Sequence, residues 1–90
     1  MMFPMLATGD SMLPTMKKIG FIVSKKFTKY EIGDIIELLT KDSKIHCHRI
    51  VNIDQYFVTT KGDNYKFSMP YEICVPIENI RGKIVWWFPR

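Results

Sequence analysis

Two kinds of residue that cooperate in hydrolysis occur in suitable settings: a serine in a turn-rich segment and two histidines in an apolar run. Ser11 lies in Gly9–Thr15, a segment whose residue types are also common in turns that do no chemistry. His46 and His48 lie in Ile45–Val51. A serine hydroxyl becomes a useful nucleophile when a neighbouring base removes its proton, and imidazole suits this work near neutral pH. A serine and histidine pair is therefore a candidate for nucleophilic catalysis.

The two histidines also raise the question of a metal site. Residues two apart on a strand point to the same face, so His46 and His48 should lie together with Ile50. The chain has no third histidine, and a zinc site needs further ligands. Cys47 and Cys74 are too few and too far apart to indicate a disulfide framework or a four-ligand zinc site. We expect no metal and no cofactor, and we interpret the cysteines as buried, reduced thiols.

Four short segments carry more information in their order than any of them does alone. They read GDSMLPT, IGDII, HRIV and TKGDN and occupy Gly9–Thr15, Ile32–Ile36, His48–Val51 and Thr60–Asn64. In this order and spacing they resemble the conserved segments of the type I signal peptidase family, which shares a clan of serine peptidases with the SOS-repressor peptidases. The resemblance runs from about Gly9 to Val85 and so covers most of the chain.

The resemblance implies roles for particular residues. In the family the serine before methionine attacks the scissile carbonyl, which corresponds to Ser11. The first position of the HRIV segment holds the general base, a lysine in typical bacterial enzymes and a histidine in archaeal and endoplasmic-reticulum forms, so His48 implies the histidine branch. The backbone amide of Ser11 is the implied oxyanion donor. Many bacterial members have a second donor, a serine, two residues before the nucleophile, where this chain has Gly9.

The carboxylate that would orient the imidazole is left open. Asp63 matches the first aspartate of the family's Gly-Asp-Asn segment. Members with a histidine base usually have another aspartate within several residues, whereas Tyr65–Pro70 contains none. Three alternatives follow: Asp63 orients His48, Asp63 braces its turn, or a Ser-His dyad works without an acid.

The scaffold that must position these residues is predicted to be mainly β. Runs rich in β-branched and aromatic residues are bounded by turn signals, and no apolar repeat of helical period extends over three turns. Ile45–Ile53 and Phe57–Thr60 should form a hairpin, and Pro76–Ile80 one helical turn. We expect a small, partly open β-barrel or β-ribbon of about five strands. The expected strands are Phe21–Val23, Ile35–Leu39, Ile45–Ile53, Phe57–Thr60 and Lys83–Phe88.

Size, composition and charge limit the other possibilities. A chain of 90 residues with 47% apolar and 24% charged residues predicts one folded domain, spanning residues 1–90, with catalytic function implied by the resemblance. The net charge of +4 comes largely from an early group of lysines, Lys17 to Lys29. No nucleic-acid-binding motif accompanies it, so we expect a solvated face and no nucleic-acid partner.

Membrane association is expected only through a partner or through the apolar ends, Met1–Leu6 and Trp86–Phe88. No run approaches the length of a membrane span, and the start lacks the pattern of a signal peptide. We therefore expect a soluble protein in the cytoplasm, peripheral to a membrane at most. The resemblance implies a serine endopeptidase that cleaves an extended peptide or precursor protein after small residues.

Two other hypotheses compete with this one. A peptide-binding module that kept the fold without the activity is motivated by Gly9 and by the missing second aspartate. A self-cleaving regulatory domain like those of SOS-type repressors is disfavoured, because those use a lysine base and are joined to a DNA-binding segment, whereas this chain has His48 and no such segment.

Overall fold

The computed structural model describes residues 2–9, 11–16 and 19–89, with side chains described for residues 9, 11–16 and 22–87. In this part of the chain the structure is mainly β, as predicted, and seven strands form one antiparallel sheet. No described helix is long and apolar enough to cross a membrane. The elements are β1 (Met2–Thr8), β2 (Ile19–Lys25), β3 (Ile35–Leu39), β4 (Ile45–Ile53), β5 (Phe57–Lys61), the 3-10 turn η1 (Pro70–Glu72), β6 (Val75–Pro76), the 3-10 turn η2 (Ile77–Asn79) and β7 (Ile80–Pro89).

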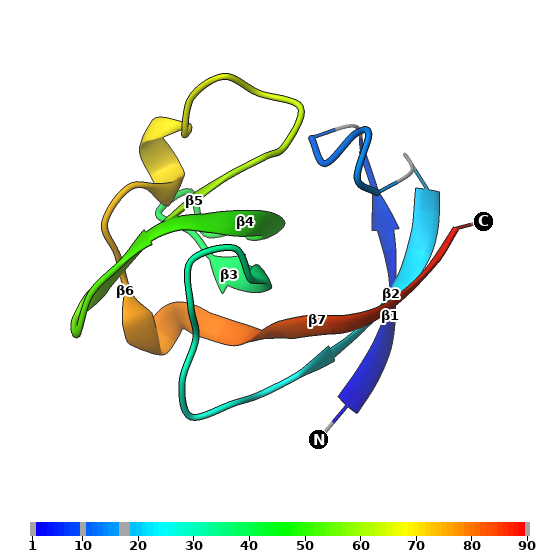
Figure 1. Cartoon of the computed structure of the whole chain (residues 1–90), viewed down its shortest axis with the longest axis horizontal. Helices are drawn as coiled ribbons and strands as arrows, with labels where there is room; N and C mark the ends of the chain where they lie inside the picture. The colour runs from blue at the N-terminus through cyan, green and yellow to red at the C-terminus, as the bar shows by residue number, and fades with distance from the viewer. Residues whose placement is uncertain (1, 10, 17–18, 90) are drawn as a thin grey trace.

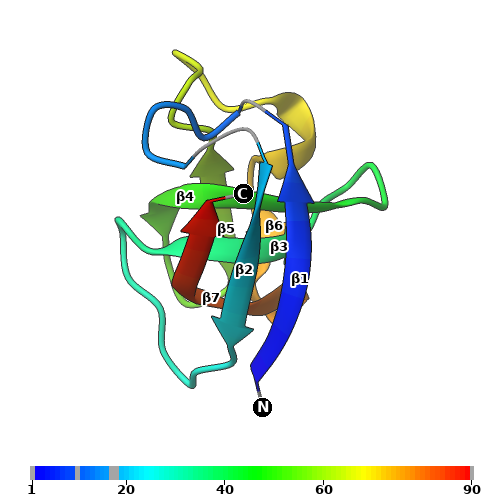
Figure 2. The same cartoon turned by 90° about the vertical axis from the view of Figure 1, so that its right-hand side faces the viewer.

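The sheet is open, and β7 joins its two parts. The strand order is β1-β2-β7-β3-β4-β5-β6, which places β1 and β6 at the edges. The first residues of β7 pair with β3 and the later ones with β2. Figure 1 shows β7 running from the part formed by β3 to β6 towards the part formed by β1 and β2. In Figure 2, β1 and β2 run across the direction of β3 and β4.

Two hydrophobic clusters hold the sheet together, and β3 and β4 contribute to both because their side chains alternate in direction. Ile36 and Ile50 belong to the first cluster, whereas Ile35 and Cys47 pack against the second. The first cluster consists of Ile36, Leu38, Ile50, Val58, Val75 and Ile80, and the second has Met12, Met16 and Ile22 at its centre. Because Met12 and Met16 follow β1 in sequence, burial of their side chains anchors the turn that contains Ser11.

The predicted turn chemistry is present where the sequence placed it. The Asp54 carboxylate accepts hydrogen bonds from the backbone amides of Tyr56 and Phe57, at 2.7 and 2.8 Å, and so closes the β4–β5 hairpin. Asp34 accepts from the amide of Glu31 at 2.9 Å, and Gly33 has a φ of 99°, a conformation that favours glycine. The helical turn expected near Pro76–Ile80 is η2.

The sheet has more strands than the sequence predicted. β1 was not expected, and its seven residues pair with the full length of β2, which is longer than the predicted Phe21–Val23. Proline and alanine, both present in β1, are depleted in strands, so formation of β1 depends on its pairing with β2. β6 has two residues, too short to leave a pattern in the sequence. Of the two apolar ends, the side chains of Met1–Leu6 lie outside the described residues, whereas Trp86 is exposed and Trp87 packs against the second cluster.

The two cysteines differ in their surroundings, which corrects the prediction that both are buried. Burial, with the negative charge of Glu37 nearby, raises the pKa of the Cys47 thiol to about 12. Cys74 is exposed, and both cysteines are free.

We therefore expect one thiol of the native protein to react with an alkylating reagent at pH 8, and two after unfolding, since only the thiolate is the nucleophile. Cys74→Ser should abolish the rapid reaction and Cys47→Ser should leave it unchanged. Mass spectrometry of the alkylated protein measures this, and equal reactivity of both thiols in the native protein would contradict the described burial of Cys47.

Candidate functional site

The structure brings the predicted nucleophile and base into hydrogen-bond contact. Ser11 lies in the turn after β1, and its Oγ is 3.0 Å from Nε2 of His48. His48 lies in the middle of β4, opposite Ile36 of β3, with 3% of its side chain exposed. Thirty-seven positions separate the two residues in the chain, so their contact is a product of the fold. Its length is that of a serine hydroxyl donating to an imidazole nitrogen.

The other imidazole nitrogen contacts Glu72, which the sequence analysis did not identify. The distance from His48 Nδ1 to Glu72 Oε1 is 2.5 Å, and the Glu72 side chain is completely buried. Ser11, His48 and Glu72 therefore form a continuous hydrogen-bonded line that ends on a buried carboxylate. This is the arrangement of a catalytic triad, with glutamate as the acid.

The buried carboxylate of Glu72 has several hydrogen-bond donors. Thr60 Oγ1 donates to Oε1 at 2.7 Å, and the backbone amide of Met69 donates to Oε2 at 2.8 Å. Burial by itself raises the pKa of Glu72, but hydrogen bonds from His48, from the Met69 amide and from Thr60 outweigh it, and the pKa lies below its ordinary value. Glu72 is therefore ionised at neutral pH.

Ionisation of Glu72 determines where the proton on His48 lies. A carboxylate is only an acceptor, so Nδ1 must carry the proton that joins it to Glu72. In the neutral imidazole Nε2 then has a free lone pair directed at the Ser11 hydroxyl. The structure thus holds His48 in the tautomer that a general base for Ser11 requires.

The sequence around Glu72 explains why its carboxylate points inward. Proline suits the first position of a helical turn, and Pro70 opens η1 after an extended Met69. Glu72 is the third residue of that turn, from which a glutamate can reach back to the amide preceding the turn. It does so through the bond from Met69, which leaves the other oxygen facing Thr60 and His48.

Asp63 lies on a different network. Arg49 binds it through two nitrogens, Nε to Oδ1 and Nη2 to Oδ2, each at 2.9 Å, and Thr15 Oγ1 donates to Oδ2 at 2.5 Å. The bonds from Arg49, acting against burial, lower the pKa of Asp63. Of the three alternatives drawn from the sequence, this geometry supports the bracing role, and the carboxylate that contacts His48 belongs to Glu72.

The four segments noted in the sequence meet around this network. Arg49 also donates to the carbonyl of Gly33 at 2.7 Å, and the amide of Asn64 donates to the carbonyl of Ser11 at 2.8 Å. Figure 1 shows the turn after β1 beside the loop that follows β5. A Cβ at Gly62 would lie 2.6 Å from the Ser11 carbonyl oxygen, so only glycine permits this approach. The segments therefore serve to fix the Ser11 turn against β4.

The oxyanion site stays a prediction. The backbone amide of Ser11 is its expected donor, and Asp10, the preceding residue, lies outside the described residues. Gly9 has a φ of 114°, a conformation that an L side chain rarely adopts. The glycine at this position therefore coincides with a backbone conformation that favours glycine.

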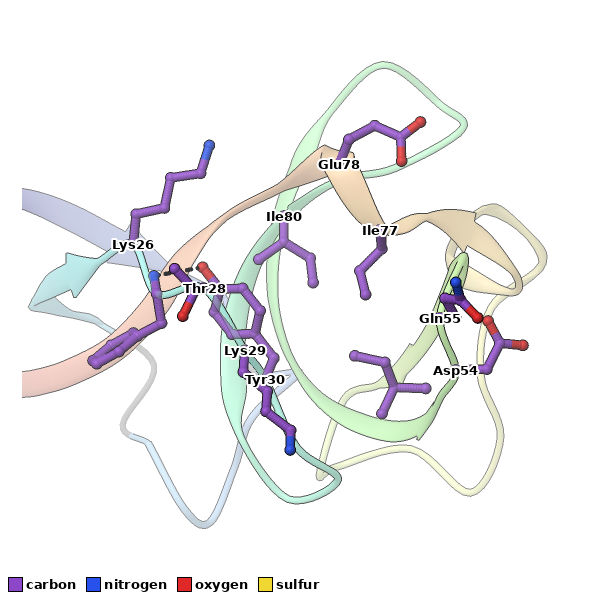
Figure 3. Close-up of a pocket in the computed structure, with 11 residues that line it drawn as sticks. Lys26, Thr28, Lys29, Tyr30, Asp54, Gln55, Ile77, Glu78 and Ile80 are labelled. Atoms are coloured by element: carbon purple, nitrogen blue, oxygen red, sulfur yellow. Dashed lines mark hydrogen bonds between the residues drawn. The ribbon is translucent and has the colours of Figure 1, made fainter.

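No cluster of three or more potential metal ligands occurs among the described residues. The hollow drawn in Figure 3, of about 600 Å³, lies at the β2–β3 loop and the β4–β5 turn. Apolar side chains of Tyr30, Ile53 and Ile77 line it together with both basic and acidic residues. Ser11, His48 and Glu72 are not among its lining residues, so this hollow is separate from the candidate site.

Comparisons with models of known protein families, with curated proteins and with solved structures gave no match.

Sequence reasoning found two of the three residues in the hydrogen-bonded line. The sequence predicts Ser11 and His48, but Glu72 is a glutamate that lies beyond Tyr65–Pro70, the segment in which the family resemblance implies an aspartate. A usable signal was present in Met69–Glu72, where proline opens a turn and glutamate occupies its third position. That pattern predicts the local bonding of Glu72 but not its contact with a histidine 24 positions away.

A side chain at position 62 should disturb the Ser11 turn, because Gly62 lies against the Ser11 carbonyl. Gly62→Ala should displace the Ser11 turn and lower the rate of Ser11 reaction with an alkyl fluorophosphonate by about a hundredfold, because a misplacement of about 1 Å is enough for such a loss. Asn64→Ala is the matched control: it keeps the backbone bond to Ser11, removes only an exposed side chain and should react at the wild-type rate. Circular dichroism checks that both variants fold, and an unchanged rate in folded Gly62→Ala would contradict the described packing.

Proposed function

We propose that this protein is a serine endopeptidase of the signal peptidase type, with Ser11 as nucleophile, His48 as general base and Glu72 as the orienting acid. The observation that carries the proposal is the continuous line of hydrogen bonds from Ser11 Oγ to His48 and on to the buried Glu72 carboxylate. The resemblance of the surrounding segments supports the same class. The proposed substrate is an extended segment of a peptide or precursor protein, cleaved after small side chains.

The proposed reaction follows from the positions of these atoms. Ser11 Oγ bonds to the scissile carbonyl carbon while its proton passes to Nε2 of His48, and the carbonyl oxygen becomes an oxyanion facing the Ser11 amide. Glu72 stabilises the imidazolium through Nδ1–H and keeps its own charge. When the carbon–nitrogen bond breaks, the leaving amine takes the proton from Nε2. Water then attacks the acyl carbon while Nε2 of His48 takes its proton. The bond between Ser11 Oγ and the acyl carbon breaks, Oγ regains the proton from Nε2, and the carboxylic acid product leaves.

The contact between Glu72 and His48 also bears on the binding-module alternative. That alternative was motivated partly by the lack of a second aspartate after Asp63. Glu72 supplies the carboxylate for His48 that the missing aspartate would otherwise have to provide. This contact supports the peptidase over the binding module. The remaining observation in favour of the binding module is Gly9, which stands where many signal peptidases have a serine that donates to the oxyanion.

Cleavage of a defined peptide library should be lost most completely without Ser11 or His48, less without the Glu72 carboxylate and least without the Asp63 carboxylate. Ser11→Ala and His48→Ala should abolish cleavage, and Glu72→Gln should lower the rate on the order of a thousandfold, because an amide no longer enforces the tautomer of His48. Asp63→Asn should lower it by about tenfold or less, because it weakens a brace without touching the imidazole. New peptide termini found by mass spectrometry give both the rate and the residues before the cut.

The same four variants separate the competing assignments. Glu72→Gln with full activity, together with inactive Asp63→Asn, would restore Asp63 as the acid. Cleavage by Ser11→Ala would eliminate the proposal. The binding-module hypothesis predicts a different outcome: the wild-type protein binds extended peptides but neither cleaves them nor reacts with an alkyl fluorophosphonate.

The lowered pKa of Glu72 predicts a pH dependence of stability. An unfolded glutamate has a pKa of about 4.3. A carboxyl whose pKa is lower in the folded state stabilises that state above the unfolded value and loses this contribution as pH falls through the folded value. From about pH 5 downward, the free energy of unfolding should therefore fall more steeply in the wild type than in Glu72→Gln. Urea unfolding measured at several pH values tests this, and parallel curves would show that Glu72 is not preferentially ionised in the folded protein.

A further inference from the structure

His46 lies beside the candidate site and has no part in the proposed reaction. It precedes His48 by two residues on the same face of β4, as the alternation of the strand predicts, and the two ring centroids are 5.5 Å apart. The His46 side chain is 23% exposed, whereas that of His48 is 3% exposed. His46 therefore sits at the rim of the site, with the base behind it.

The turn between β3 and β4 holds His46 from one side. Asp42 Oδ2 lies 3.1 Å from Nε2 of His46. Thr40 donates to the same carboxylate, and the amide of Lys44 donates to it at 3.3 Å. The hydrogen bond from Thr40 and that with His46 lower the pKa of Asp42 to about 2. Asp42 is thus a fixed, charged partner for the outer edge of the His46 ring.

On its other side His46 contacts the turn that carries the acid. Its ring stacks on that of Tyr71, with centroids 4.7 Å apart and an angle of 23° between the planes. The carbonyl of Tyr71 accepts a hydrogen bond from the amide of Lys41, at 2.9 Å, from the same β3–β4 turn. Two contacts therefore hold the residue immediately before Glu72: the ring of His46 in β4 and the backbone amide of Lys41 in the β3–β4 turn.

These contacts matter because η1 is short. A 3-10 turn of three residues has little stability of its own. Within η1, Tyr71 is half-buried and Glu72 is fully buried, whereas Pro70 before them and Ile73 after them are exposed. The bonds to Met69, Thr60 and His48 orient the Glu72 carboxylate, and contacts to the neighbouring Tyr71 hold η1 itself against the sheet.

We propose that His46 is a positioning residue of the site: clamped by Asp42 and stacked on Tyr71, it holds η1 against the sheet so that Glu72 stays in hydrogen-bond contact with Nδ1 of His48. The inference rests on the proposed role of Glu72 and adds how that residue is kept in place. It assigns His46 no contact with substrate and no proton transfer.

The test compares His46→Ala, which removes the stacking ring, with His46→Phe, which keeps a ring over Tyr71 but loses the contact with Asp42. Two quantities are measured on the full chain: the far-downfield proton resonance of His48 Nδ1–H, which reports its short bond to the Glu72 carboxylate, and the rate of Ser11 reaction with an alkyl fluorophosphonate. Glu72→Gln identifies the resonance, because that change weakens the bond.

In His46→Ala the resonance should move upfield or broaden, and the rate of probe reaction should fall by about tenfold to a hundredfold. His46→Phe should stay within about threefold of the wild type, because stacking is retained. Asp42→Ala removes the same contact with His46 that His46→Phe loses, together with the bonds from Thr40 and the Lys44 amide, and it keeps the stacking on Tyr71. It should shift the resonance in the same direction as His46→Ala, by a smaller amount. It keeps the test available if His46→Ala does not fold.

The resonance does not depend on peptidase activity, so the two proposals fail separately. If both the resonance and the probe rate are unchanged in folded His46→Ala, the positioning role is wrong and the peptidase proposal still stands. If His46→Ala does not fold, the same result in Asp42→Ala has the same meaning. A wild-type protein without any downfield resonance would overturn the positioning role directly. A resonance that moves as expected in a protein whose Ser11 never reacts would support the positioning role and count against the peptidase.

Discussion

The buried charge of Glu72 is the constraint on which the rest of the site depends. An ionised carboxylate without access to water is tolerated only when its oxygens are hydrogen-bonded. Thr60, Met69 and His48 provide these bonds, and each comes from a different part of the fold: β5, the residue before η1, and β4. Satisfying the carboxylate therefore fixes the spacing of these elements, and it orients His48 towards Ser11 at the same time.

The two carboxylates near the site, Asp63 and Glu72, have different hydrogen-bond partners and different structural roles. Asp63 is bound by the planar guanidinium of Arg49 in two places and by Thr15, so it joins the Ser11 turn to the sheet from outside. Glu72 acts from inside, on the imidazole itself. A fork of two bonds between arginine and a carboxylate fixes direction as well as distance, which suits a brace. A carboxylate already engaged in this way has little capacity left to orient a histidine.

Local chemistry made much of the scaffold predictable. The β4–β5 hairpin follows from Asp54 and the β-branched residues on either side, and alternation along β4 correctly placed His46 and His48 on one face. β1 could not be predicted in the same way, because its residues have little intrinsic strand preference and pair through β2, a partner that the chain reaches only after the Ser11 turn. Cys74 is exposed and has a φ of 51°. It directly precedes β6, and its exposure likewise depends on how β6 pairs with β5.

The sequence by itself determined the mainly β architecture and identified Ser11 and His48 as candidates, because turn residues, strand alternation and a serine within a characteristic segment are properties of neighbours along the chain. The tertiary structure alone decided which acid meets His48. Asp63 and Glu72 are both carboxylates after β5. The residues around Glu72 predict its bond with the Met69 amide, but nothing local predicts which of the two carboxylates lies against Arg49 and which is buried behind the imidazole. That choice depends on contacts between β4, β5 and η1, which exist only once the sheet has formed.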